Sequence, residues 1–159
     1  MFIKPDYNVE KLEDIDFAAL KTAGKSVLLF DLDSTLMPSK SATYLPRTKE
    51  LLDNLQKDFT VAVITNNNKP AYISKVREIS DFEIIDDAKK PSAAKIFEYL
   101  AKIGKTPRDA VMIGDRPLTD ILAGILAGTT TVLVDSITRD SEGFEVRFVR
   151  WLERLSVKK

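Results

Sequence analysis

The sequence of 159 residues contains no cysteine and no histidine. Without cysteine there is no disulfide framework, no thiolate nucleophile and no thiolate metal site. Without histidine there is no imidazole general base, no Ser-His-Asp triad and no ordinary zinc site. Any chemistry must therefore use carboxylates, hydroxyls, amides, lysine or arginine. A ligand set made only of oxygen atoms favours a hard cation such as Mg²⁺.

The chain also lacks an excess of either charge, because 24 Lys and Arg residues balance 24 Asp and Glu residues. This balance gives no indication of a nucleic-acid partner held by bulk charge. The first residues lack the continuous apolar run of a signal peptide, and no stretch approaches the roughly 18 apolar residues of a membrane span. We expect a cytoplasmic protein in which residues 1–159 form a single domain, since this length suits one ordinary core.

Apolar runs rich in β-branched residues predict strands that are buried on both faces, as in a parallel sheet. These runs cover residues 26–32, 59–65, 82–85, 110–115 and 129–134. Segments with helical spacing lie between them, at 46–58, 69–79, 91–102 and 117–127, and Pro91 is a favourable helix start. Amphipathic segments 9–23 and 141–157 flank this pattern. The alternation predicts a three-layer α/β/α fold with a doubly wound parallel sheet.

Polar side chains follow the predicted strands at the edge where open parallel sheets bind ligands. They are Asp31 and Asp33 after the first strand, Thr65 and Asn66 after the second, Lys90 after the third, and Asp115 after the fourth, with Asp120 one helical turn further. If the first and fourth strands are neighbours, Asp31, Asp33 and Asp115 converge. Clustered carboxylates repel one another, so this arrangement favours a bound Mg²⁺ together with a phosphate group.

The simpler interpretation of each residue is an ordinary turn or helix cap, since Asp, Ser, Thr and Asn are common there. The chain contains a second Asp-x-Asp, Asp14 to Asp16, which follows no strand and receives no function. The segment 24–26 reads Gly-Lys-Ser like the end of a phosphate-binding loop, but Ala19 stands where the first glycine of that motif belongs. Only the full set of strand ends indicates a site.

The segments FDLDSTL, VITNN, KKP and IGDRPLTDI, in this order, resemble the four motifs of the haloacid dehalogenase (HAD) superfamily. The resemblance covers about residues 24–135. The AKKP and GDRPLTDI forms look most like the YqeG-type branch, which is related to phosphatidylglycerophosphate phosphatases. This resemblance implies a Rossmann-like core with strand order 3-2-1-4-5 and a Mg²⁺-dependent phosphomonoester hydrolase.

The resemblance also implies roles for the site residues. Asp31 would be the nucleophile that forms an aspartyl-phosphate, and Asp33 would be the general acid and then the general base. The metal ligands would be Asp31, the backbone carbonyl of Asp33, and Asp115, supported from behind or through water by Asp120. Thr65 and Asn66 would bind the phosphoryl group, and Lys90 would stabilise its charge. Ser34 departs from the branch, which often has Asn there.

Related proteins often carry an inserted cap domain, but predicted elements fill residues 36–64 and 66–89. We therefore expect no cap domain and an open site, with the loop from Met37 to Leu45, including Tyr44, as a flap. An open site suits a large or surface-bound phosphomonoester, or one covered by a partner subunit. The oligomeric state stays open.

The segment 141–159 predicts an amphipathic helix with apolar residues along one face and basic residues along another. The apolar face would hold Phe144, Phe148, Trp151 or Leu152, and Leu155, and the basic one Arg147, Arg150, Arg154 and Lys158. The simpler expectation is that the apolar face packs on the sheet. The alternative is peripheral contact of 141–159 with an anionic membrane, which would suit a lipid phosphate such as phosphatidylglycerophosphate.

Three alternatives to a lipid phosphatase remain. The first is a phosphatase of a small soluble phosphate ester. The second is a receiver-type phospho-acceptor module, although such modules place the acceptor Asp after the third strand. The third is a binding protein without turnover, which the intact Asp33 argues against.

Overall fold

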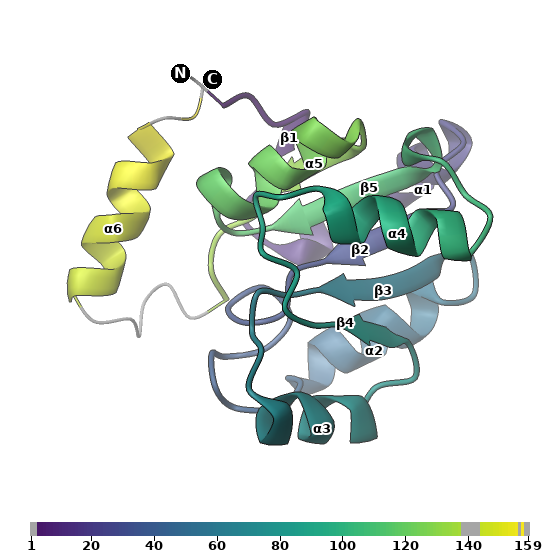
Figure 1. Cartoon of the computed structure of the whole chain (residues 1–159). Helices are drawn as coiled ribbons and strands as arrows, with labels where there is room; N and C mark the ends of the chain where they lie inside the picture. Colours follow the sequence, from purple (N-terminus) through teal and green to yellow (C-terminus); the bar gives the residue numbers. More distant parts are fainter. Residues whose placement is uncertain (1–2, 138–143, 156, 158–159) are drawn as a thin grey trace.

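The computed structural model describes residues 3–137, 144–155 and 157. A parallel six-stranded sheet forms its centre, with the order β1-β6-β5-β2-β3-β4 (Figure 1). The strands are β1 (Tyr7–Asn8), β2 (Val27–Phe30), β3 (Thr60–Ile64), β4 (Glu83–Ile85), β5 (Ala110–Gly114) and β6 (Thr130–Leu133).

The five strands predicted from the sequence are all present, as β2 to β6. Their order in the sheet, β4-β3-β2-β5-β6, confirms the predicted order 3-2-1-4-5. β1 is an additional edge strand, which pairs Tyr7 with Val132 and Asn8 with Leu133. The sequence did not indicate it, because its two residues are exposed and form no apolar run.

Helices cover both faces of the sheet and complete the three layers (Figure 1). The α-helices are α1 (Phe17–Thr22), α2 (Pro46–Leu55), α3 (Pro70–Glu78), α4 (Ala94–Lys102), α5 (Leu122–Ala127) and α6 (Phe144–Leu155). Short turns are η1 (Leu12–Asp14), η2 (Pro107–Asp109) and the π-helical η3 (Pro117–Ile121).

Two apolar clusters lie on opposite sides of the sheet. Leu28 and Phe30 of β2 pack with α1, α2 and α3, whereas Val27 and Leu29 pack with α4 and α5. All four side chains are fully buried. The continuous apolar run therefore signals a central strand with a helix layer on each side.

Several helix boundaries differ from the prediction. The helix predicted over 91–102 is α4, which begins at Ala94 and not at Pro91. The N–H of Ser92 donates to the carbonyl of Lys89, and the hydroxyl of Ser92 accepts from the N–H of Ala94. The predicted helix 117–127 is divided into η3 and α5, and the segment 9–23 into η1 and α1.

The second Asp-x-Asp has the capping role of the simpler interpretation. The carboxylate of Asp14 accepts from the N–H of Lys11, and that of Asp16 accepts from the N–H of Ala19 at 2.9 Å. The Gly-Lys-Ser segment follows the end of α1, where Gly24 has a φ of 90°. Asp14 and Asp16 thus lie at the end of η1 and at the start of α1, and the Gly-Lys-Ser segment precedes β2.

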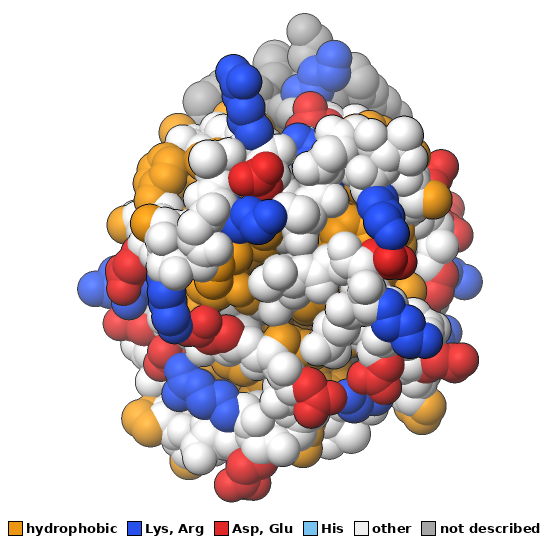
Figure 2. All heavy atoms as spheres, turned by 90° about the vertical axis from the view of Figure 1, so that its right-hand side faces the viewer, with side chains coloured by type: hydrophobic (Ala, Val, Ile, Leu, Met, Phe, Trp, Pro, Cys, Tyr) orange, Lys and Arg blue, Asp and Glu red, His pale blue; other side chains and the backbone are white. Residues whose placement is uncertain are grey.

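The face over the amino ends of the strands is shown in Figure 2, where Lys and Arg side chains alternate with Asp and Glu. This mixture agrees with the equal numbers of basic and acidic residues in the chain. Among the residues that the structure describes, no helix is both long and apolar enough to cross a bilayer.

α6 stands beside the carboxyl end of the sheet (Figure 1). Residues 141–143, 156 and 158–159 of the predicted segment lie outside the described residues, as do the side chains of Phe144, Arg147, Phe148 and Arg150. The apolar side chains of α6 that the structure describes are exposed, namely Val149, Trp151, Leu152 and Leu155. Packing of the predicted apolar face on the sheet stays a prediction, because Phe144 and Phe148 belong to that face. Two ion pairs connect α6 to the rest of the protein, Glu153 with Arg116 and Arg154 with Asp135, both with N–O distances of 3.0 Å.

Candidate active site

The register of the sheet places two of the predicted acidic residues side by side. Phe30 of β2 is paired with Ile113 of β5, and the N–H of Asp31 donates to the carbonyl of Ile113 at 2.9 Å. Asp115 follows β5 directly. The side chains of Asp31 and Asp115 therefore leave neighbouring strands at the same edge of the sheet.

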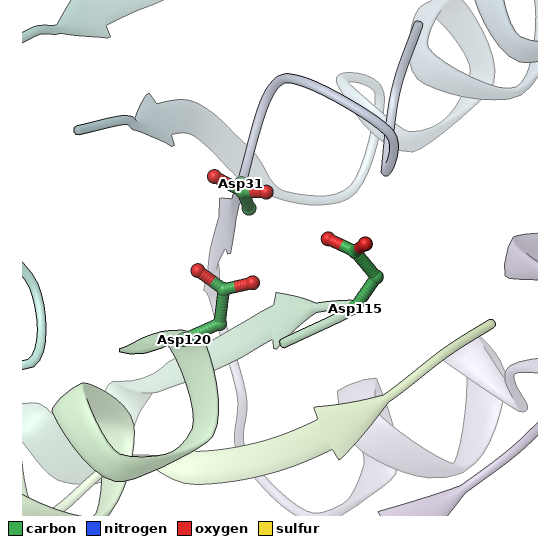
Figure 3. A group of neighbouring side chains, drawn as sticks. All are labelled: Asp31, Asp115 and Asp120. Atoms are coloured by element: carbon green, nitrogen blue, oxygen red, sulfur yellow. The ribbon is translucent and has the colours of Figure 1, made fainter. Parts of the chain in front are cut away.

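A third carboxylate joins them, that of Asp120 from η3. Carboxylate oxygens of Asp31, Asp115 and Asp120 lie within 4.8 Å of one another, and Figure 3 shows the three side chains around a common space. All three residues are buried. The π-helical turn is of a kind often found at functional sites, and here it presents Asp120 to the two strand ends.

Gly114 makes room for Asp120. A Cβ atom at Gly114 would lie 2.4 Å from both Cβ and Oδ2 of Asp120, which is closer than side chains approach. The glycine before Asp115 is thus required by the third carboxylate.

Lys90 lies among these carboxylates. Its Nζ is 2.8 Å from Oδ1 of Asp31 and 2.6 Å from Oδ1 of Asp120. Burial and the Asp120 carboxylate raise the pKa of Asp31 well above its ordinary value, although Lys90 opposes this shift. Burial alone would lower the pKa of Lys90, but the two carboxylates outweigh it and raise that pKa. Lys90 therefore stays charged.

The composition of this group fits a hard divalent cation. Three carboxylates face one buried ammonium group, so positive charge is in deficit, and the donor atoms are all oxygen. The hydroxyl of Thr35 donates to Oδ1 of Asp115 at 2.9 Å and helps to orient it. The sequence predicted for Thr35, which stands inside the first motif, only a role in shaping the turn.

Asn66 and Thr65 shape the adjacent loop. Oδ1 of Asn66 accepts from the N–H of Lys90 at 2.7 Å, and its Nδ2 donates to the carbonyl of Lys90 at 3.0 Å. The side chain of Asn66 is therefore used to hold Lys90, and phosphate binding by Asn66 stays a prediction. The Thr65 oxygen accepts from the N–H of Asn67, which leaves its hydroxyl proton for another acceptor.

Asp33 lies apart from the three clustered carboxylates, which differs from the expected convergence with Asp31 and Asp115. Its Oδ1 accepts from the hydroxyl of Tyr72 at 2.7 Å, and its Oδ2 accepts from Nδ2 of Asn67 at 3.2 Å. Burial and the hydrogen bond to Asp33 raise the pKa of Tyr72. No sequence pattern indicates a functional role for Tyr72, which stands in the first turn of α3.

A cavity of about 210 Å³ opens over the group. Its lining includes Asp31, Asp33, Ser34, Ser39, Thr65, Asn66, Asn67, Lys90, Arg116, Thr119 and Asp120. The structure thus brings Asp31, Asp33, Thr65, Asn66, Lys90 and Asp120 to one cavity, with Asp115 beside it. Arg116 at its rim connects the cavity to α6 through Glu153.

The loop from Met37 to Leu45 is anchored at its end and not free like a flap. Tyr44 is buried, its hydroxyl lies 2.7 Å from Oγ of Ser80, and its ring meets that of Phe82 edge to face. The prediction that Tyr44 belongs to a flap was therefore wrong, because its ring is part of the core.

Known proteins similar to this chain are HAD-like hydrolases and phosphatases. A family model described as HAD-hydrolase-like matches residues 87–144. The chain is 30% identical to phosphatidylglycerophosphate phosphatase 1 (chloroplastic/mitochondrial) of Arabidopsis thaliana, over 99% of this chain and 48% of that protein. It therefore spans about half the length of that relative. It is 29% identical to the probable phosphatase YqeG of Bacillus subtilis, over 96% of this chain and 88% of that protein.

Solved structures support the fold. A HAD-superfamily hydrolase from Geobacter sulfurreducens aligns with a TM-score of 0.55 and 16% identity, over 69% of this chain and 89% of that one. The segments that resemble the four motifs meet at one edge of this sheet, and both curated relatives are named as phosphatases. The chain is therefore similar to HAD-like hydrolases and, over nearly its whole length, to a YqeG phosphatase and a phosphatidylglycerophosphate phosphatase.

Proposed function

We propose that this chain is a Mg²⁺-dependent phosphomonoester hydrolase that acts through an aspartyl-phosphate on Asp31. The observation that carries the proposal is the buried group of Asp31, Asp115 and Asp120 around Lys90, at the floor of a polar cavity. A carboxylate at a strand end is a rigidly mounted nucleophile, and a buried ammonium group offsets the charge of a transferred phosphoryl group.

In the proposed reaction an oxygen of Asp31 attacks phosphorus, and the ester oxygen leaves. The hydroxyl of Thr65 and the ammonium of Lys90 bind phosphoryl oxygens, with Asn66 contributing through its backbone. Asp33 gives a proton to the leaving oxygen and then takes one from the water that hydrolyses the aspartyl-phosphate. Asp31, Asp115, Asp120 and the backbone carbonyl of Asp33 would hold Mg²⁺, which when bound supplies positive charge beside the nucleophile.

The proposed substrate is a large or surface-bound phosphate ester, with a lipid phosphate such as phosphatidylglycerophosphate as the first candidate. The names of the relatives and the exposed apolar side chains of α6 support this choice. In this proposal residues 1–159 act as a single domain without a cap, and α6 makes peripheral contact with an anionic membrane.

The first test is hydrolysis of para-nitrophenyl phosphate with Mg²⁺, with Mg²⁺ removed by chelation, and in Asp31→Asn. We expect turnover only in the first condition. Asp16→Asn is the matched control, since Asp16 has the same Asp-x-Asp spacing but caps α1. Full activity in Asp31→Asn would refute the nucleophile, and a long-lived phosphoprotein without turnover would indicate a phospho-acceptor module.

The second test compares kcat/KM for phosphatidylglycerophosphate in vesicles, sugar phosphates and nucleotides. We expect the highest value for the lipid. A higher value for a soluble ester would reassign the substrate and leave the chemistry of the site unchanged.

A further inference from the structure

The carboxylate of Asp33 is held asymmetrically. Oδ1 accepts two hydrogen bonds, from the hydroxyl of Tyr72 at 2.7 Å and from the N–H of Lys40 at 3.3 Å. Oδ2 accepts one, from Nδ2 of Asn67 at 3.2 Å. Each carboxylate oxygen has about two acceptor positions, so these donors fill Oδ1 and leave one position on Oδ2.

The donors are themselves fixed. The N–H of Asn67 donates to the hydroxyl oxygen of Thr65 at 3.1 Å, and Oδ1 of Asn67 accepts from the N–H of Lys69 at 3.0 Å. These contacts also assign the orientation of the Asn67 amide, with Nδ2 toward Asp33. Tyr72 is half-buried in the first turn of α3, which begins at Pro70. Asp33 is therefore tied to the end of β3 and the start of α3.

We propose that Tyr72 is a positioning residue for proton transfer, which holds Oδ1 of Asp33 so that Oδ2 carries the mobile proton. This inference rests on the proposed phosphomonoesterase activity. The hydroxyl of Tyr72 donates to Oδ1 whether Oδ2 is protonated or not, so one geometry serves both halves of the reaction. Tyr72 keeps its own proton throughout.

The proton balance is complete with groups of this chain and water. In the first half the bond between phosphorus and the ester oxygen breaks, an Asp31–phosphorus bond forms, and the proton on Oδ2 of Asp33 moves to the leaving oxygen. In the second half water attacks phosphorus, its proton moves to Oδ2 of Asp33, and the Asp31–phosphorus bond breaks. Oδ2 is then protonated for the next substrate.

The test uses the dependence of kcat/KM on the leaving group. An alkyl alcohol needs a proton as it leaves, whereas para-nitrophenolate leaves without one, and kcat/KM reports only the steps up to release of the alcohol. In Tyr72→Phe we expect kcat/KM for an alkyl phosphate to fall about 10- to 100-fold, and that for para-nitrophenyl phosphate to fall less than about 3-fold. A residue that merely supports the fold would lower both equally.

Tyr44→Phe is the matched control. It removes a hydroxyl with a 2.7 Å contact to Ser80, away from the cavity lining. We expect it to leave both kcat/KM values unchanged. If Tyr72→Phe does not fold, as judged by its unfolding midpoint, Tyr72→Met is the second variant that lacks the hydroxyl.

A double-mutant cycle tests whether Tyr72 acts through Asp33. In an Asp33→Asn background, Tyr72→Phe should lower kcat/KM for the alkyl phosphate no further. A further loss there, or equal losses for the two leaving groups, would overturn the inference. If the wild-type chain hydrolyses neither ester with Mg²⁺, the proposed function itself fails, and that outcome is distinct from a failure of the Tyr72 proposal.

Discussion

The side-chain amide of Asn66 binds the backbone of Lys90 at both of its polar ends, with distances of 2.7 Å and 3.0 Å. The loop after β3 therefore fixes the position of the residue that places an ammonium group among the carboxylates. This contact also explains how the side chain of a lysine in a loop can be directed at Asp31 and Asp120.

Replacing Asn66 by Ala should lower kcat more than it raises KM. The variant loses both contacts to the Lys90 backbone, so the ammonium group is less well placed when charge develops on the phosphoryl oxygens. We expect kcat for para-nitrophenyl phosphate to fall about 10-fold and the free energy of unfolding to fall by about 1 kcal/mol. Asn68→Ala, at an exposed neighbour, is the control. Equal activity of the two variants would contradict the role of the Asn66 amide.

Replacing Lys90 by Met should make the chain depend on Mg²⁺ for stability. Removal of one partner from a buried ion pair costs about 3–5 kcal/mol, and here it leaves Asp31 and Asp120 without their ammonium group. Added Mg²⁺ should raise the unfolding temperature of the variant more than that of the wild type, although activity falls at least about 100-fold. If Mg²⁺ stabilises neither protein, the three carboxylates do not form a metal site.

Replacing Gly114 by Ala should weaken Mg²⁺ binding, since the added methyl group collides with Asp120. The matched control is Gly104→Ala, where nothing lies within 4 Å of the added methyl group but φ is 70°. Both variants should lose stability, the control by about 1 kcal/mol because of its left-handed backbone. Calorimetric titration should show weaker Mg²⁺ binding only in Gly114→Ala. If both variants or neither of them bound Mg²⁺ more weakly than the wild type, Gly114 would have no specific role in the metal site.

Replacing Ser34 by Asn should stabilise the chain. Ser34 has a φ of 68°, in the left-handed region that Asn tolerates better than Ser. This observation gives a physical reason for the Asn that the branch often has there. We expect the free energy of unfolding to rise by up to about 1 kcal/mol, measured by urea denaturation. A decrease would mean that contacts of the Ser34 side chain outweigh the backbone preference.

Replacing Asp109 by Asn should remove part of the acid sensitivity of the fold. Hydrogen bonds from the backbone N–H and the hydroxyl of Thr106 lower the pKa of Asp109. A lowered pKa adds stability above the unfolded value, and this contribution is lost as pH falls through the folded pKa. The variant should therefore be less stable than the wild type near pH 7, and this difference should shrink as pH falls through the lowered pKa of Asp109. If the difference in the free energy of unfolding between the two proteins did not change with pH, Asp109 would not contribute to the acid sensitivity of the fold.

The central sheet could be predicted because its strands are continuous apolar runs, and a run such as that from Val27 to Phe30 permits little but burial on both faces. The place of the candidate site could be predicted as well, because the carboxyl ends of parallel strands lie at one edge of the sheet. The edge strand β1 was not predictable, because two exposed residues carry no periodicity.

The directions and contacts of the side chains within the site could not be predicted from the sequence. Tyr72 meets Asp33 from 39 positions away, and no local pattern distinguishes it from another aromatic residue at a helix start. Similarly, Asn66 has the residue type expected for phosphate binding, but its amide is used by Lys90. These contacts depend on how α3 and the two loops pack, which only the assembled fold determines.

The pairing of Phe30 with Ile113 has a consequence for how this site tolerates sequence change. The spacing of the backbones that carry Asp31 and Asp115 is that of neighbouring strands, about 4.8 Å, and it does not depend on which apolar residues fill β2 and β5. Many substitutions within these strands should therefore leave the site intact. Deleting one residue from β5 would turn every later side chain to the opposite face. The number of residues in the strand is thus under stronger constraint than their identity.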